Sequence, residues 1–203
     1  MTGPIARSSN RAHPPGCDAV TLNEHVPGSR RLSQRISEGD GIAIIVCVND
    51  ADGARNAELQ GAKAIAVYEA IDGIRDATTL PLLWIGAGTP SEADAVRIRP
   101  EEDTVDNVEC VVDVRDDEEL ELALERLDPE IFLLSSREID EDADPLDAVL
   151  ELLPDVPAGK LAIAQVDVGN RDEVLALERA GIDAVLVPAR HVGDLVGHKP
   201  LDV

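Results

Sequence analysis

The sequence predicts an α/β protein with a (β/α)8 barrel of the TIM type. Eight apolar runs of four to seven residues recur along the chain, and amphipathic stretches with helical spacing lie between several of them. Strands alternating with helices are typical of a parallel sheet, and eight strands in order indicate a closed barrel, with an open doubly wound sheet as the alternative. The runs are residues 42–48, 64–68, 81–85, 95–98, 110–114, 131–134, 161–166 and 184–187.

The chain is shorter than this fold usually requires, and the shortage is local. A (β/α)8 barrel typically has about 250 residues, whereas this chain has 203. The third and fourth strands are separated only by "GAGTPSEAD", and a parallel crossover usually needs about a dozen residues or more. The next connection, "RPEEDTVDNVE", is also short and polar. We therefore expect an incomplete barrel with shortened units around strands 3 to 5, and an exposed sheet edge there.

Four segments are expected to form helices. "SRRLSQRISEG" (29–39) predicts a short helix before the first strand. The other three have apolar residues at helical spacing, and they are residues 116–127, 144–153 and 170–181. The last of them has Asn170 as its expected N-cap and Gly181 as its stop signal.

Composition limits the partners and the location of the protein. Residues 1–28 are rich in Pro, Gly, Ser and Asn, which predicts a flexible N-terminal arm, with a single barrel domain over residues 29–203.

The net charge is −23, which repels nucleic acid and anionic lipid, so neither is expected as a partner. No apolar run approaches the roughly 20 residues of a membrane span, and the N-terminus has no apolar signal core. A cytoplasmic protein is expected.

The cysteines and histidines show no metal-binding pattern. Cys17, Cys47 and Cys110 are widely spaced without a CxxC motif, and the four histidines lack zinc spacing. No metal and no cofactor are therefore expected. Cys47 and Cys110 lie in apolar runs, where a cysteine usually packs as a small buried hydrophobe.

Residues 110–187 resemble the C-terminal half of indole-3-glycerol phosphate synthase. "CVVDVRDDEEL", "LLSSREI", "AQVDVG" and "DAVLVP" correspond in order and interval to that family's "LVEVHDEEEL", "GINNRDL", "VAESGI" and "DAFLVG". The resemblance implies a (β/α)8 barrel of tryptophan biosynthesis. Members of the family close the indole ring of carboxyphenylamino-deoxyribulose phosphate with loss of carbon dioxide and water.

The resemblance also implies a set of site residues. The candidate catalytic residues are Asp113 in place of the fifth-strand glutamate, Ser135 in place of an asparagine, the retained Arg137, and Gln165 on the seventh strand. The candidate substrate-binding residues are Ser136, Asn49 and Arg115.

At other positions this chain lacks the residue types on which the family's reaction depends. The third-strand lysine that acts as general acid corresponds to Ile85, and the first-strand Glu-x-Lys corresponds to Cys47-Val48-Asn49. Asp167 and Pro188 fall where the family cradles phosphate, and proline has no N–H to donate. A phosphorylated ligand in the usual place is therefore disfavoured.

Three hypotheses follow from these residues. The first is an active synthase with a substitute acid; the second, which the losses favour, is a degenerate member that binds a small molecule or a protein partner. The third is a barrel enzyme of different chemistry built on Asp113, Arg115 and Arg137. The alternative is a purely structural role, in which that cluster is a buried ion pair that closes the barrel mouth. The single Trp84 is interpreted as a packing residue.

Overall fold

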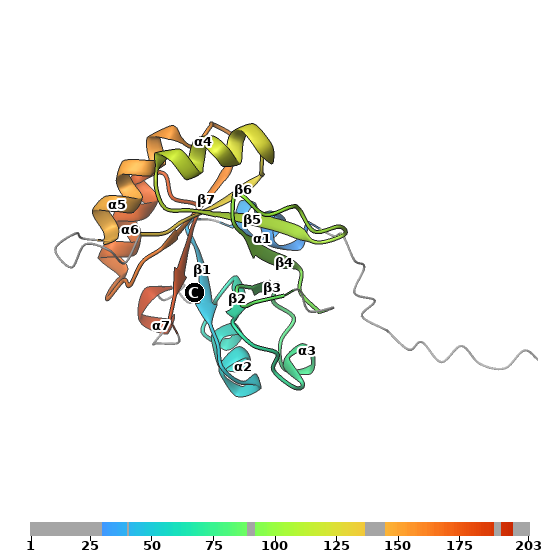
Figure 1. Cartoon of the computed structure of the whole chain (residues 1–203). Helices are drawn as coiled ribbons and strands as arrows, with labels where there is room; N and C mark the ends of the chain where they lie inside the picture. The colour runs from blue at the N-terminus through green and yellow to red at the C-terminus, as the bar shows by residue number, and fades with distance from the viewer. Residues whose placement is uncertain (1–29, 40, 89–91, 137–144, 189–191, 197–203) are drawn as a thin grey trace, which may run out of the picture.

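A closed barrel of eight parallel strands forms the centre of the molecule (Figure 1). The structure is a computed structural model and describes residues 30–39, 41–88, 92–136, 145–188 and 192–196. The strands are β1 (Ala43–Cys47), β2 (Ala64–Val67), β3 (Leu82–Trp84), β4 (Ala95–Ile98), β5 (Glu109–Val114), β6 (Ile131–Leu134), β7 (Leu161–Gln165) and β8 (Ala184–Val187). Each lies within a residue or two of the bounds expected from the apolar runs, so the predicted fold class is confirmed.

The ring of strands is complete. β1 pairs with β8 from Ala43↔Ala184 to Val46↔Val187, which closes the barrel. The strands beside the short connections also pair directly: Leu83 lies opposite Ala95, and four residue pairs join β4 to β5. The expected exposed edge near strands 3 to 5 was therefore wrong, because every described strand has a neighbour on both sides.

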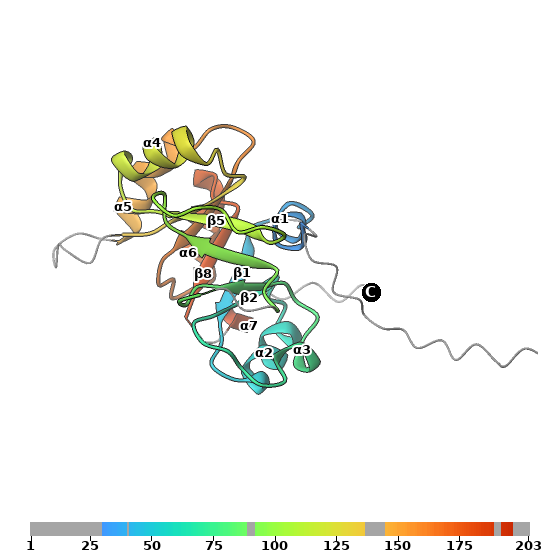
Figure 2. The ribbon, with the colours of Figure 1, turned by 45° about the vertical axis from the view of Figure 1, so that its right-hand side comes forward.

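What is shortened is the outer layer of helices. Figure 1 shows α4, α5 and α6 gathered on one side of the barrel and α2 and α3 on another. The described residues between β3 and β4, and those between β4 and β5, contain no helix, and loops run along that flank in Figure 2. The helices are α1 (Arg31–Ser37), α2 (Ala51–Leu59), α3 (Ile74–Ala77), α4 (Asp117–Arg126), α5 (Pro145–Leu152), a 3-10 turn (Leu153–Asp155), α6 (Arg171–Ala180) and α7 (Val192–Leu195). Among the described helices, none has the length and apolarity to cross a membrane.

Local sequence explains where the helices begin and end. The Asn170 side chain accepts a hydrogen bond from the Glu173 N–H at the start of α6, and Gly181 ends that helix with a φ of 107°, as expected. Asp116 caps α4 in the same way, and three acidic residues follow it in the first turn. α2 was not expected, because "ADGARNAEL" has few large apolar residues; Asp50 caps it.

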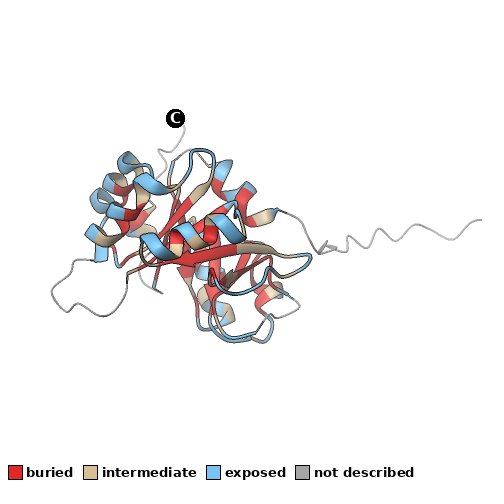
Figure 3. Ribbon diagram, turned by 45° about the horizontal axis from the view of Figure 1, so that its top comes forward, coloured by how far each residue is buried: buried red, intermediate tan, exposed pale blue. Residues whose placement is uncertain are grey.

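Buried side chains form two separate cores, one inside the ring of strands and one between the strands and the helices. Figure 3 shows buried residues along the strands and exposed residues on the outer sides of the helices. Alternation along each strand decides which residues enter which core. The inner core contains Ala43, Ile45, Ala64, Ala66, Leu83, Ile85, Ala95, Val111, Ile131, Leu133, Ile163, Ala184 and Leu186. Trp84 faces the outer core and is 7% exposed, which agrees with its interpretation as a packing residue.

α1 closes the base of the barrel, at the amino ends of the strands. Its residues Leu32 and Ile36 belong to the inner core, where the small alanine side chains of several strands leave room for them. The Glu109 carboxylate accepts hydrogen bonds from the Leu32 N–H at 2.7 Å and from the Ser33 N–H at 3.2 Å. A negative charge at a helix N-terminus is favourable, so Glu109 anchors α1 beneath the ring.

A buried carboxylate also joins several elements at this base. Asp94, before β4, forms ion pairs with Arg31 at 3.0 Å and Arg75 at 2.7 Å. The two guanidinium groups also donate to backbone carbonyls, Arg31 to Thr79 and Arg75 to Leu80 and Glu92. Their donors are thus used within the protein, as expected of a structural cluster.

Candidate functional site

The carboxyl ends of the strands present a ring of side chains toward the barrel mouth. Continuing the inward-facing alternation by one step along each strand identifies the members of this ring. They are Cys47, Tyr68, Ile85, Arg97, Asp113, Ser135 and Gln165. In barrels of this type active sites lie at this end, so it is the first place to look for chemistry.

Asp113 is the centre of a buried polar cluster at the mouth. Its residue is 1% exposed, and its Oδ1 accepts a hydrogen bond from the Ser135 hydroxyl at 2.6 Å. Its Oδ2 lies 3.2 Å from Nη1 of Arg99 and 3.6 Å from Nη1 of Arg97. One carboxylate therefore faces two guanidinium groups, and the cluster, with Asp113 ionised, carries a net charge of +1. We call Arg97, Arg99, Asp113 and Ser135 the mouth cluster.

The register of the sheet brings the mouth cluster together. Arg97 on β4 lies opposite Val111, so Asp113 is two residues further along β5 on the same face. Leu133 lies opposite Asp113, and Ser135 follows it at the inward-facing position after β6. Arg99 follows β4 with the same alternation as Arg97.

The two arginines are only partly used by the protein. Their side chains are 30% (Arg97) and 26% (Arg99) exposed, in contrast to 2% for Asp113. Nη1 of Arg99 is buried and, despite its distance from Asp113, has no hydrogen-bond acceptor among the described residues. Both guanidinium groups are thus partly accessible at the carboxyl ends of the strands.

Tyr68 and Cys47 border the mouth cluster on the side of β1 and β2. Tyr68 is 50% exposed; burial raises its pKa, the groups of Cys47 and Asp113 act in the same direction, and Arg97 opposes them. Burial raises the pKa of the Cys47 thiol to about 11. Cys47 is therefore a neutral thiol at pH 7, packed against the inner core, and not an activated nucleophile.

Arg115 does not complete the cluster that the sequence suggested. Its backbone N–H donates to Glu119 at 2.9 Å and its Nε donates to both carboxylate oxygens of that residue. Hydrogen bonding to Glu119 raises the pKa of Arg115. The expected Asp113–Arg115 pair is therefore wrong. Glu119 at the start of α4 engages Arg115, and the arginines that pair with Asp113 are Arg97 on β4 and Arg99 just after it.

The remaining predicted site residues lie at the mouth without joining the cluster. Gln165 and Ser136 are partly buried at the ends of β7 and β6, and Asn49 is exposed beyond β1. No hydrogen bond or ion pair between these three and the mouth cluster occurs within the described part of the chain. Arg137 lies outside the described residues.

The position expected for the general acid is apolar. Ile85 is 2% exposed and packs in the inner core at the carboxyl end of β3. The two lysines in the described ranges lie at the other end: Lys160 pairs with Asp128 at 2.8 Å, and Lys63 precedes β2. A proton donor of the lysine type is therefore absent from the described part of the mouth. Lys199 lies outside the described residues.

The N–H groups of the glycines that follow strands seven and eight are already engaged. The Gly169 N–H donates to the Glu173 carboxylate at 2.7 Å, and the Gly193 N–H donates to the Gln60 side chain at 3.2 Å. Pro188 is exposed and has no N–H. A carboxylate of the protein therefore occupies the turn where a phosphate would need free donors. Ala189 lies outside the described residues.

Sequence reasoning missed Arg97 and Arg99. Their signal is present in "AVRIRP", where two arginines alternate with apolar residues and so share the inward face with Ala95. The family motifs directed attention to the other strands, and the fourth strand carries none of them.

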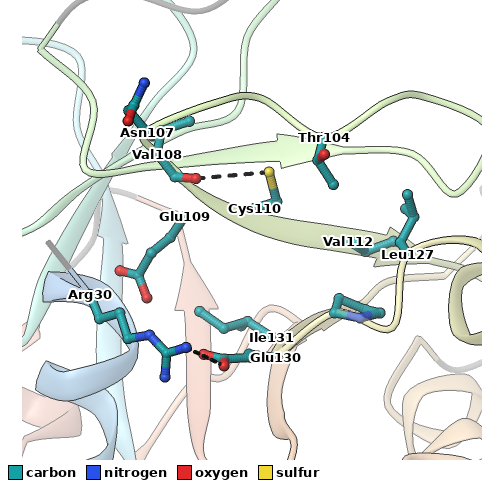
Figure 4. A pocket seen from close by; sticks show the side chains of 11 residues that line it. Arg30, Thr104, Asn107, Val108, Glu109, Cys110, Val112, Leu127, Glu130 and Ile131 are labelled. Atoms are coloured by element: carbon teal, nitrogen blue, oxygen red, sulfur yellow. Dashed lines mark hydrogen bonds and ion pairs between the residues drawn. The ribbon is translucent and has the colours of Figure 1, made fainter. Parts of the chain in front are cut away.

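The structure also has a cavity away from the mouth (Figure 4). It has a volume of about 430 Å³ and lies beside the first residues of β5 and β6, where Glu109 and Ile131 contribute to its lining. An ion pair of 2.7 Å between Arg30 and Glu130 borders it. It is therefore at the amino ends of the strands, opposite the mouth cluster.

Comparisons with curated proteins find a partial similarity. The indole-3-glycerol phosphate synthase of Campylobacter fetus subsp. fetus (strain 82-40) is 28% identical over 81 residues, which are 40% of this chain and 31% of that enzyme. The enzyme of Variovorax paradoxus (strain S110) is 35% identical over 77 residues, 38% of this chain and 29% of that enzyme. The chain thus matches less than a third of the length of these relatives. No protein-family model matches it.

Solved structures share the fold at low sequence identity. N-acetylmannosamine-6-phosphate 2-epimerase from Clostridium perfringens matches with a TM-score of 0.58 and 14% identity, over 72% of this chain and 86% of that one. Thiamine phosphate pyrophosphorylase from Pyrococcus furiosus matches with a TM-score of 0.55 and 16% identity, over 76% and 89%. The chain is thus a (β/α)8 barrel with a partial sequence similarity to indole-3-glycerol phosphate synthase.

Proposed function

We propose that this protein is a small-molecule-binding barrel, similar to indole-3-glycerol phosphate synthase, that binds its ligand at the mouth and does not close the indole ring. The observation that carries the proposal is the composition of the mouth. A buried aspartate, a serine and two partly exposed arginines converge there, and an isoleucine occupies the position of the acid.

The chemistry of ring closure explains why activity is not expected. The reaction needs an acid to protonate a ketone and to help expel its hydroxyl. Ile85 cannot transfer a proton, and the neutral thiol of Cys47 is a poor donor at a pKa of about 11. A guanidinium group is a permanent cation in proteins, so the arginines of the mouth cluster can bind an anion but are not suited to act as acids.

A single-turnover assay tests the proposal. Protein in excess is mixed with carboxyphenylamino-deoxyribulose phosphate, in low and in molar salt, and indoleglycerol phosphate is separated by chromatography and detected by indole fluorescence. The expected result is no product, while an active synthase under the same conditions serves as the positive control. The separation step matters because Trp84 contributes its own indole fluorescence.

Product formation that disappears in Asp113→Ala would overturn the proposal and favour the alternative, an active synthase. Arg55→Gln, an exposed position on α2 paired with Asp52, is the control variant and should behave as the unaltered protein in either case.

A further inference from the structure

The base of the barrel provides an internal reference for the mouth cluster. Both ends have one buried aspartate between two arginines: Asp94 with Arg31 and Arg75, and Asp113 with Arg97 and Arg99. At the base, the arginines donate their other N–H groups to backbone carbonyls. At the mouth, no hydrogen bond from either guanidinium to a carbonyl occurs within the described residues. Nη1 of Arg99 lies 3.2 Å from Asp113 Oδ2 as an ion pair, without the geometry of a hydrogen bond. A purely structural role therefore explains the base cluster and leaves the donors at the mouth unexplained.

Resting on the proposed function, we propose that Arg97 and Arg99 bind the carboxylate of a small organic monocarboxylate at the barrel mouth. A planar carboxylate fits the fork of guanidinium donors, and charge-assisted hydrogen bonds of this kind are among the stronger ones in proteins.

Charge decides between a carboxylate and a phosphate. The mouth cluster has a net charge of +1, which a single negative charge neutralises, whereas a phosphate dianion would leave an excess negative charge in a protein of net charge −23. The N–H groups of Gly169 and Gly193 are already engaged by side chains. The half-exposed ring of Tyr68 borders the same mouth and can contact the organic body of the ligand.

The test is an NMR titration of the full chain with acetate, benzoate, benzamide and inorganic phosphate at constant ionic strength. At least one carboxylate should shift the amide signals at the carboxyl ends of β4, β5 and β6. If benzoate binds, its neutral isostere benzamide should have an affinity at least about tenfold lower, because benzamide cannot form the charge-assisted hydrogen bonds. Phosphate should bind more weakly than the carboxylate.

Variants separate the roles of the residues. Arg97→Gln and Arg99→Gln should each weaken carboxylate binding by about tenfold, while Arg55→Gln, which removes the same charge from the exposed face of α2, should not. Asp113→Asn should tighten binding, because it raises the net charge of the cluster from +1 to +2. A merely structural aspartate would not produce that gain.

Other outcomes overturn the inference. Preference for phosphate, or equal binding of benzoate and benzamide, would contradict the ligand class. Mouth binding that is unchanged in both arginine variants would contradict their role while leaving a mouth ligand in place. If no carboxylate at tens of millimolar shifts the amide signals at the mouth, the inference is wrong. The proposed lack of ring closure is tested separately by the single-turnover assay.

Discussion

Three side chains compensate for the cost of burying the Asp113 carboxylate. An ionised carboxylate that is 1% exposed is stable only if opposite charges and hydrogen-bond donors replace water around it. Ser135 supplies one donor, and Arg97 and Arg99 supply the charge. The same cluster therefore contributes to stability, and under our proposal its arginines also bind the ligand.

Asp113→Ala is expected to destabilise the fold by roughly 2–4 kcal/mol, since it brings two arginines together without a counter-charge and leaves Ser135 unpaired. The lower part of that range reflects the partial exposure of the arginines, which water can stabilise. Urea denaturation measures the loss. Asp113→Asn, which retains an acceptor for Ser135, should cost less, and equal stability of the two variants would argue against this explanation.

Cys47 is expected to react slowly with thiol reagents. With a pKa of about 11, its thiolate fraction at pH 8 is about one thousandth, roughly a hundredfold below that of a thiol with a pKa of 9.0. The rate should rise as the pH approaches 11. The measurement is the reaction with a disulfide reagent in a Cys17→Ser/Cys110→Ser background, native and in urea. Equal native and unfolded rates would contradict the burial of this thiol.

At the scale of elements, the outer layer is uneven while the strands are regular. α4 and α6 have capping side chains and amphipathic faces, whereas the described residues on both sides of β4 contain no helix. β4 pairs with β5 along its length and with β3 at Ala95 and Val96, so backbone pairing with both neighbours fixes its position. This arrangement leaves the arginines of β4 positioned by the sheet.

α1 depends on Glu109 for its position at the base. Replacing Glu109 by Ala removes the acceptor for the N–H groups of Leu32 and Ser33 and should cost about 1–2 kcal/mol, as loss of a helix cap and of a favourable helix-dipole charge. Hydrogen exchange should become faster in α1 and stay slow in β8. Glu130→Gln, which affects only the exposed pair with Arg30, is the matched control. Unchanged protection of α1 in Glu109→Ala would show that Leu32 and Ile36 alone hold it.

The elements that the sequence predicted are those with a strong periodic signal. All eight strands and the helices from Asp117, Pro145 and Arg171 follow from apolar spacing and caps. α2 was missed because alanine replaces large apolar residues. The partner of Asp113 was misassigned because Arg115 is near it in sequence, whereas Arg97 and Arg99 reach it through the pairing of β4 with β5.

At the scale of the whole molecule, charge is the dominant feature. The sequence has 41 acidic and 18 basic residues, and repulsion between exposed carboxylates opposes the compact state. The formal charge of the mouth cluster, +1, is thus opposite in sign to that of the protein as a whole. Under our proposal this difference favours a small anion at the mouth, while the protein as a whole repels large polyanions.

Salt should therefore stabilise the protein. The urea midpoint is expected to rise between 10 mM and 0.3 M NaCl and then level off, since the Debye length falls from about 30 Å to several ångströms over this range. KCl should give the same curve if screening is the cause. A urea midpoint that does not change with salt would mean that the acidic residues of this protein of net charge −23 are too far apart for their repulsion to destabilise the fold.

The closed seam between β1 and β8 has a consequence for behaviour at high concentration. A sheet with free edges offers backbone donors and acceptors to neighbouring chains and can template aggregation. Here all eight described strands are paired on both sides, so the thinning of the helical layer creates no such template. Residues 101–107, between β4 and β5, are accordingly a location for grafting a foreign peptide, and we expect the pairing of β4 with β5 to survive the longer loop.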